Sequence, residues 1–255
     1  MRKNEVREKL LAGRPVLGAM LGLGSPNAAE LMAMAGYDFL IIETEHNGLD
    51  SAEVEHMLMA IGQEAVPVVR VPSADPVFIQ RALDIGGMGI LVPMVRTARE
   101  AAAIVAATRY PPQGSRGFGP LRASRYTFDY EEYYAGANDN ILVALIVETR
   151  EALDNLDEIA AVPGVDALFF GLFDLCLSLG LNPMRQPFPE LEEAMEAAAE
   201  TGRKRGVAIG VGVPSPGELR ARNEMGFRFH VYGTDYMLLG AAAKAGVEAF
   251  RSLEE

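Results

Sequence analysis

The chain has 255 residues, 49% of them hydrophobic, and its 35 acidic and 23 basic residues give a net charge of −12. The negative charge argues against nucleic acid as the main partner, and no apolar stretch reaches the roughly 18 residues that a membrane span needs. A single cysteine, Cys176, excludes an intramolecular disulfide and indicates a reducing, cytoplasmic location.

Short runs of β-forming residues alternate with helical segments along the chain. A charged N-terminal stretch predicts a helix over about 3–12, and a last helix is expected over about 235–253. Several of the intervening helical segments begin at Ser, Thr or Asp and stop at Gly, as helices prefer. Strands are expected at residues 15–21, 38–42, 66–71, 88–94, 141–147, 165–170, 207–212 and 227–232.

Eight strands, apolar on both faces and each followed by a helix, predict a parallel sheet closed into a (β/α)8 TIM barrel. We expect one domain over residues 1–255, because barrels of this kind have about 250 residues. A doubly wound open sheet is the alternative, but no G-x-G-x-x-G follows the first strand. A long irregular connection at roughly 110–140 is expected to be functional or to contact another subunit.

Catalytic residues of such barrels lie at the C-terminal ends of the strands. The second strand ends at Glu43 and His46, the third carries Arg70, Glu148 follows the fifth, and Asp174 follows the sixth. Each has a structural interpretation as well: the two later carboxylates could stabilise helix N-termini, and the other side chains could be ordinary surface groups. Their coincidence on one rim favours a functional site.

The residue types on this rim indicate a metal-assisted reaction. Two carboxylates without cysteine or clustered histidine suit a hard cation, Mg²⁺ or Mn²⁺, with Co²⁺ as a further candidate. Such an ion acts as a Lewis acid on a chelating carbonyl, an adjacent arginine stabilises the oxyanion, and a histidine transfers protons. Together these groups suit the enolisation of a 2-oxo acid.

Stretches spread over almost the whole chain match one known family. They are EHNGLD, VVRVP, RALDIGGMGILVPMV, ATRYPPQGSRGFG, LRAS, VET, NLDEIAAVPGVDALFFGLFDL and YGTDYMLL. In these stretches the chain resembles the HpcH/HpaI aldolases, metal-dependent class II pyruvate aldolases on a (β/α)8 barrel. The resemblance implies cleavage of a 4-hydroxy-2-oxo acid to pyruvate and an aldehyde. It also implies a homo-oligomer, a trimer or a hexamer built from trimers, with the C-terminal helix exchanged between neighbours.

The resemblance assigns roles to individual residues. Glu148 and Asp174 match the two metal ligands, and Arg70 matches the arginine that contacts the pyruvyl oxygen and stabilises the enolate. His46 matches the histidine of a proton-transferring dyad, whose acidic partner is matched by Asp84.

Further residues around this site are expected to bind the substrate or support the metal. The backbone of a short segment matches the one that holds the substrate carboxylate, as helix N-termini do for anions; its residues are Gly171, Leu172, Phe173 and Asp174. Glu43 is expected to contact a metal-bound water rather than the ion, and Glu45 to point away or support its loop.

Three departures from the family pattern concern the substrate. Glu43-Thr44 stands where Asp-Gly is usual, Ile146 replaces a glutamine, and Leu172-Phe173 replaces Pro-Ala. Because of these changes, the resemblance does not identify the aldehyde. Two alternative functions also remain: an acyl-CoA lyase of the citrate-lyase β-subunit kind, and a non-catalytic barrel that binds a metal and a 2-oxo acid.

Other reactive residues are assigned mainly structural roles. Cys176 is expected to be a small packed residue, and His230 a buried barrel residue. Arg116 and Arg122, in the long connection, are expected to make subunit contacts, with binding of a distal carboxylate as the alternative. No lysine follows a predicted strand, which disfavours a Schiff-base aldolase.

Overall fold

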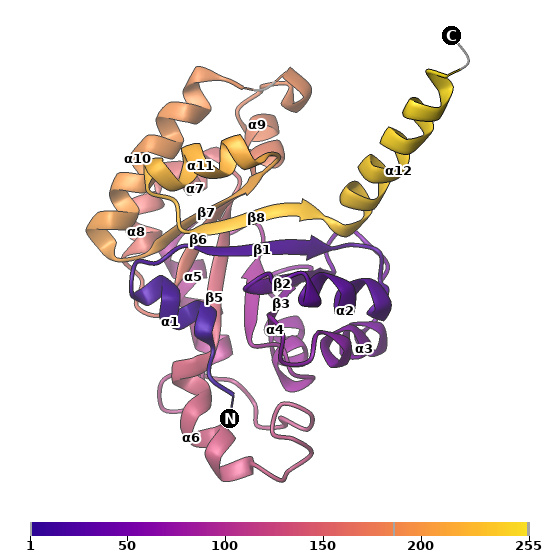
Figure 1. Ribbon diagram of the computed structural model, residues 1–255. Helices are drawn as coiled ribbons and strands as arrows, with labels where there is room; N and C mark the ends of the chain where they lie inside the picture. Colours follow the sequence, from indigo (N-terminus) through magenta and orange to yellow (C-terminus); the bar gives the residue numbers. More distant parts are fainter. Residues whose placement is uncertain (1, 186, 254–255) are drawn as a thin grey trace.

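Eight strands form the centre of the computed structural model, which describes residues 2–185 and 187–253. They are β1 Val16–Leu21, β2 Phe39–Glu43, β3 Val66–Arg70, β4 Gly89–Val92, β5 Leu142–Val147, β6 Ala167–Phe170, β7 Ala208–Val213 and β8 Phe229–Thr234. Each strand pairs in parallel with the next, and β8 pairs with β1 to close the barrel. The predicted (β/α)8 fold is therefore confirmed, and Figure 1 shows most helices packed around the strands.

The helices occupy the connections between the strands. They are α1 Glu5–Leu11, α2 Pro26–Met34, α3 Ser51–Ile61, α4 Pro76–Asp84, α5 Ala98–Thr108, α6 Tyr130–Asn140, α7 Arg150–Asp154, α8 Leu156–Ala160, α9 Leu172–Ser178, α10 Pro189–Arg205, α11 Pro216–Met225 and α12 Asp235–Arg251, with a short 3-10 helix η1 at Pro183–Arg185. Within the described chain, no helix combines the length and apolar character that crossing a membrane requires.

Two connections differ from their predicted form. The long connection at 110–140 is not irregular throughout, because its last third is helix α6. The single helix expected after β5 is divided at Asn155 into α7 and α8. Thr149 caps the start of α7, and its hydroxyl accepts a hydrogen bond from the Ala152 N–H.

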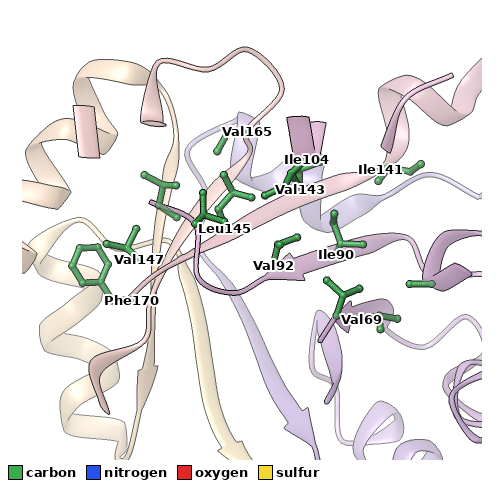
Figure 2. Close-up of a cluster of buried hydrophobic side chains, with 14 of the residues drawn as sticks. Val69, Ile90, Val92, Ile104, Ile141, Val143, Leu145, Val147, Val165 and Phe170 are labelled. Carbon is green, nitrogen blue, oxygen red and sulfur yellow. The ribbon is translucent and has the colours of Figure 1, made fainter. Parts of the chain in front are cut away.

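The strands bury both faces, which explains their nearly continuous apolar sequences. Alternate residues of β5 pack with other strand residues and with α1, and so lie inside the barrel: Leu142, Ala144 and Ile146. The residues between them pack with helix side chains outside the barrel: Val143, Leu145 and Val147. Figure 2 shows this outer cluster, in which Val143 lies beside Ile104 of α5.

The interior is tightly filled near the junction of β8 and β1. The rings of Phe39 and Phe229 stack with their centroids 4.4 Å apart. A Cβ atom on Gly18 would lie 2.3 Å from the Phe39 ring, so only glycine fits there. Val6 and Leu10 of α1 join the same interior cluster. The N-terminal half of the barrel is therefore packed, and the opposite end is left for a site.

Helix α12 extends away from the barrel, and Figure 1 shows its last turns far from the other elements. Asp235, its first residue, is buried and accepts hydrogen bonds from the N–H groups of Gly22 and Leu23, at 2.9 and 3.1 Å. The rest of the helix leaves large apolar side chains exposed: Tyr236, Met237, Leu239, Val247 and Phe250. This distribution is unusual for a helix that closes its own barrel.

Candidate active site

The parallel register brings the predicted residues of β2 and β3 together at the C-terminal end of the barrel. Glu43 is the last residue of β2 and is in register with Arg70, the last residue of β3. Thr44 extends this pairing: its N–H and its hydroxyl both donate to the Arg70 carbonyl oxygen, at 3.1 and 2.5 Å. The backbone that carries Arg70 is thus held by the residue that departs from the family pattern.

Glu43 is a buried carboxylate with two sets of contacts. Its Oε1 accepts hydrogen bonds from the backbone N–H groups of Glu45 (2.6 Å) and His46 (3.1 Å). Its Oε2 lies 3.1 Å from Nη1 of Arg70. The first set of contacts bends the chain back immediately after β2, and the second ties that bend to β3.

This bend directs Glu45 toward Arg70 and not away from the site, contrary to expectation. The Arg70 Nε–H donates to Glu45 Oε2 at 2.5 Å, and Nη2 contacts the same oxygen. Nη2 also lies 2.9 Å from Nε2 of His46. His46 is exposed, whereas the side chains of Arg70 and Glu45 are only 12% and 16% exposed.

Glu148 follows β5 and is buried on the same rim. Its Oε1 accepts a hydrogen bond from the Met94 N–H at 2.6 Å, in the connection after β4. Burial is the main cause that raises the pKa of Glu148; the Met94 hydrogen bond and Arg70 oppose this shift, and the charges of Glu45 and Asp174 add to it. The carboxylate is therefore held in a negatively charged environment.

Gly171 allows β6 to pass close to Glu148. A Cβ atom at this position would lie 2.8 Å from Glu148 Oε2 and 3.0 Å from both Glu148 Cβ and Ile146 Cγ2. A side chain here would therefore displace the buried carboxylate. The requirement for glycine is a feature of the site that the sequence alone did not reveal.

The segment from Gly171 to Asp174 leads directly from β6 into α9. Asp174 and Phe173 are exposed, Leu172 is half-buried, and Asp174 lies in the first turn of the helix. Gly171, the N-cap residue, provides no side-chain hydrogen bond. The first backbone N–H groups of α9 therefore have no side-chain cap.

The donor set of the rim fits a divalent cation. Among residues 2–185 and 187–253, no three His, Cys, Asp or Glu side chains are close enough to hold an ion. The two expected ligands, Glu148 and Asp174, lie near enough to each other for the charge of Asp174 to raise the pKa of Glu148. A carboxylate whose pKa is raised by burial and by neighbouring acids is a suitable ligand, because a cation offsets the unfavourable negative charge.

Asp84 is not brought to His46 within the chain. It ends α4, which runs back to the start of β4, whereas His46 follows the end of β2; the two residues therefore lie at opposite ends of the barrel. Asp84 Oδ1 is paired instead with Nη2 of buried Arg116, at 2.7 Å. Arg116 also contacts the Tyr133 hydroxyl at 3.1 Å and lies over the Tyr110 ring. This pair anchors the long connection to α4.

The remaining residues singled out in the sequence lie outside this rim site. Cys176 is buried in the outer core, and burial raises the pKa of its thiol, so it does not act as an accessible nucleophile. His230 is buried in β8, where burial lowers its pKa. Arg122 donates to the Ile85 carbonyl oxygen at 3.1 Å, beside the Asp84 anchor.

Comparison with known proteins adds independent information. A family model described as HpcH/HpaI aldolase/citrate lyase matches residues 18–242. A 4-hydroxy-2-oxo-heptane-1,7-dioate aldolase from Shigella sonnei is 42% identical over 248 residues, which are 95% of this chain and 93% of that protein.

Solved structures agree with this assignment. A HpcH/HpaI aldolase/citrate lyase family protein from Burkholderia cenocepacia is 36% identical, with a TM-score of 0.90, over 97% of this chain and 99% of that one. A citrate lyase β subunit from M. tuberculosis is 16% identical, with a TM-score of 0.60, over 89% and 94% of the two chains, a likeness that shows the fold alone. From its sequence, its barrel and these relatives, the chain belongs to the HpcH/HpaI aldolase/citrate lyase family.

Proposed function

We propose that the chain is a divalent-metal aldolase that cleaves a 4-hydroxy-2-oxo acid to pyruvate and an aldehyde. The contact of Arg70 with His46, on the same rim as Glu148, carries this proposal, because it combines an oxyanion partner, a proton acceptor and a metal ligand. The curated relatives named as 4-hydroxy-2-oxo-heptane-1,7-dioate aldolases support the lyase class.

Glu148 and Asp174 would hold the metal ion, Mg²⁺ or Mn²⁺ by the hardness of carboxylate ligands, with Co²⁺ as a further candidate. A bound cation supplies Lewis acidity to the 2-oxo group of the substrate. The uncapped N–H groups at Leu172, Phe173 and Asp174 would hold the substrate carboxylate, as helix N-termini do.

Arg70 and His46 would then act on the substrate oxygens. Nη1 of Arg70 lies 3.1 Å from Glu43 Oε2, and because it carries two N–H groups, the second can donate to the 2-oxo oxygen. A guanidinium has only donors, so its 2.9 Å contact with Nε2 of His46 is a hydrogen bond when that nitrogen carries no proton. A neutral imidazole can receive the proton of the substrate 4-hydroxyl as the bond between C3 and C4 breaks. The enolate of pyruvate is then protonated at C3 by the proton that His46 received, which restores the neutral ring.

The projecting helix α12 suggests how subunits associate. Its exposed apolar residues, Met237, Leu239 and Phe250 among them, have no cover from their own barrel. We propose that a second copy covers them by exchange of this helix, within a trimer or hexamer. Light scattering of the full chain and of a Leu239→Lys, Phe250→Lys variant tests this: the variant should have a smaller mass, and an unchanged mass would contradict the exchange.

Exchange of the pyruvate methyl protons for deuterium, followed by NMR with Mn²⁺ or Mg²⁺, tests the function. The wild-type chain should exchange them, because enolisation of pyruvate is the reverse of the last step of cleavage, in which the enolate is protonated at C3. His46→Ala and Glu148→Ala should both lose exchange, and only the latter should lose metal affinity. Glu196→Gln, an exposed charge change on α10, serves as the matched control. No exchange by the metal-loaded wild type would refute the proposal.

The two alternatives receive less support. An acyl-CoA lyase of the citrate-lyase β kind shares the barrel, but that relative is only 16% identical. A CoA-thioester cleavage assay on the same preparation distinguishes it. A non-catalytic metal-binding barrel predicts metal affinity in the wild type without any methyl exchange.

A further inference from the structure

Glu45 occupies a central position between the two residues to which the proposed chemistry is assigned. Its Oε2 lies in the cleft between Nε and Nη2 of Arg70, with the Nε contact at 2.5 Å. The same oxygen is 3.7 Å from Nε2 of His46. Arg70, His46 and Glu45 thus form a triangle in which each residue lies near the other two.

The position of Glu45 is imposed by Glu43. Because Glu43 Oε1 accepts from the N–H groups of both Glu45 and His46, the chain cannot continue in the direction of the strand. Glu43 Oε2 then lies by Nη1 of Arg70, on the side of the guanidinium that Glu45 leaves free. The guanidinium is therefore held by charge-assisted contacts from two sides.

We propose that Glu45 is a positioning residue, which fixes the plane of the Arg70 guanidinium. This inference rests on the proposed aldolase function and deepens it. Glu45 acts through Arg70, and the substrate need not touch it.

The test compares Glu45→Gln, Glu45→Asp and the control Glu196→Gln in the metal-loaded full chain. For Glu45→Gln we expect kcat of pyruvate methyl exchange to fall about tenfold to a hundredfold, since a misplacement of about 1 Å can have such an effect. The KM for pyruvate should change less than twofold. Glu45→Asp keeps the charge but shortens the reach, so its kcat should lie between those of the wild type and Glu45→Gln.

Two measurements separate positioning from a structural role. In an Arg70→Ala background, the additional Glu45→Gln change should have almost no effect on kcat of methyl exchange, because the residue through which Glu45 acts is absent. Binding of oxalate, a planar mimic of the pyruvate enolate, should weaken in Glu45→Gln, while its Mn²⁺ affinity and melting temperature remain those of Glu196→Gln.

Unchanged kcat in Glu45→Gln, or full additivity with Arg70→Ala, would overturn the inference while leaving the aldolase proposal intact. Loss of Mn²⁺ affinity in Glu45→Gln would overturn it as well, since Glu45 would then be a metal ligand. A wild-type chain without exchange would instead refute the aldolase proposal. The oxalate measurement then still reports whether Glu45 positions Arg70.

Discussion

Gly171→Ala tests whether the close passage of β6 sets the position of Glu148. The added Cβ would meet Glu148 Oε2 at 2.8 Å, and Glu148 Cβ and Ile146 Cγ2 at 3.0 Å. The first of these atoms is at the end of a side chain, but it is buried and its partner oxygen is held by the Met94 N–H. The other two atoms belong to residues at the end of β5 or just beyond it. The substitution therefore overfills a packed region.

Overpacking of this kind costs about 1–3 kcal/mol in the free energy of unfolding. For a chain of this size, each kcal/mol shifts the melting temperature by about 2–4 °C, so we expect Gly171→Ala to melt about 2–12 °C lower. Rotation of Glu148 away from Gly171 should also weaken Mn²⁺ binding, by about tenfold or more, comparable to the loss of a group that orients a ligand.

Differential scanning calorimetry in EDTA measures the first effect, and titration calorimetry with Mn²⁺ measures the second. Gly217→Ala is the matched control, because its Cβ would meet only the Ser215 hydroxyl, at an ordinary 3.7 Å. If Gly171→Ala matched Gly217→Ala in both melting temperature and Mn²⁺ affinity, the steric argument and the metal position would both be wrong.

Three further predictions concern residues around the site. Asp84→Asn should lower stability by about 3 kcal/mol, since Arg116, whose side chain is fully buried, loses its charged partner; urea unfolding checks this, with Asp157→Asn in an exposed pair as a control that should show little change. Glu148→Gln should raise the melting temperature of the metal-free protein at neutral pH, because burial raises the pKa of Glu148 and its charge is unfavourable in the fold. That gain should shrink as the pH falls through the raised pKa and the wild type becomes protonated, and a gain that grew instead would contradict this sign. Ile146→Gln, which restores the family residue, should cost about 1–3 kcal/mol by burying an amide in the barrel interior, as urea unfolding would show.

The strands and their site residues were predictable because simple rules fix them. Parallel strands put their C-terminal ends on one edge, so Glu43 and Arg70 could be placed together from their positions alone. Helix α6 was not predicted, since its polar sequence follows a turn-rich stretch and lacks a side-chain cap. The orientation of Glu45 was not predictable either: strand alternation ends at Glu43, and the direction of the chain beyond it depends on two hydrogen bonds to one carboxylate oxygen.

The dyad of His46 and Asp84 is not formed within one chain, and as a contact between two copies it stays a prediction. Similarity to a family indicated a dyad with His46, yet Asp84 precedes β4 whereas the other site residues follow strands. Position relative to the strand was therefore a signal that Asp84 belongs to the other end of its own barrel. The structure gives it a defined role there, as the charged partner of Arg116.

The charges of the rim connect the metal proposal with the arrangement around Arg70. Glu43 and Glu45 already neutralise Arg70, and no lysine or arginine nitrogen of the described chain forms an ion pair with Glu148. A divalent cation held as proposed would offset the charge of Glu148 and Asp174 without drawing on Arg70. Because Arg70 is shared between two acids, it would gain little from a neutral 2-oxo oxygen and more from one that carries a full negative charge. Interactions that strengthen in this way between substrate and enolate lower the barrier rather than merely tightening binding, so the proposed function gives the paired acids a part in catalysis.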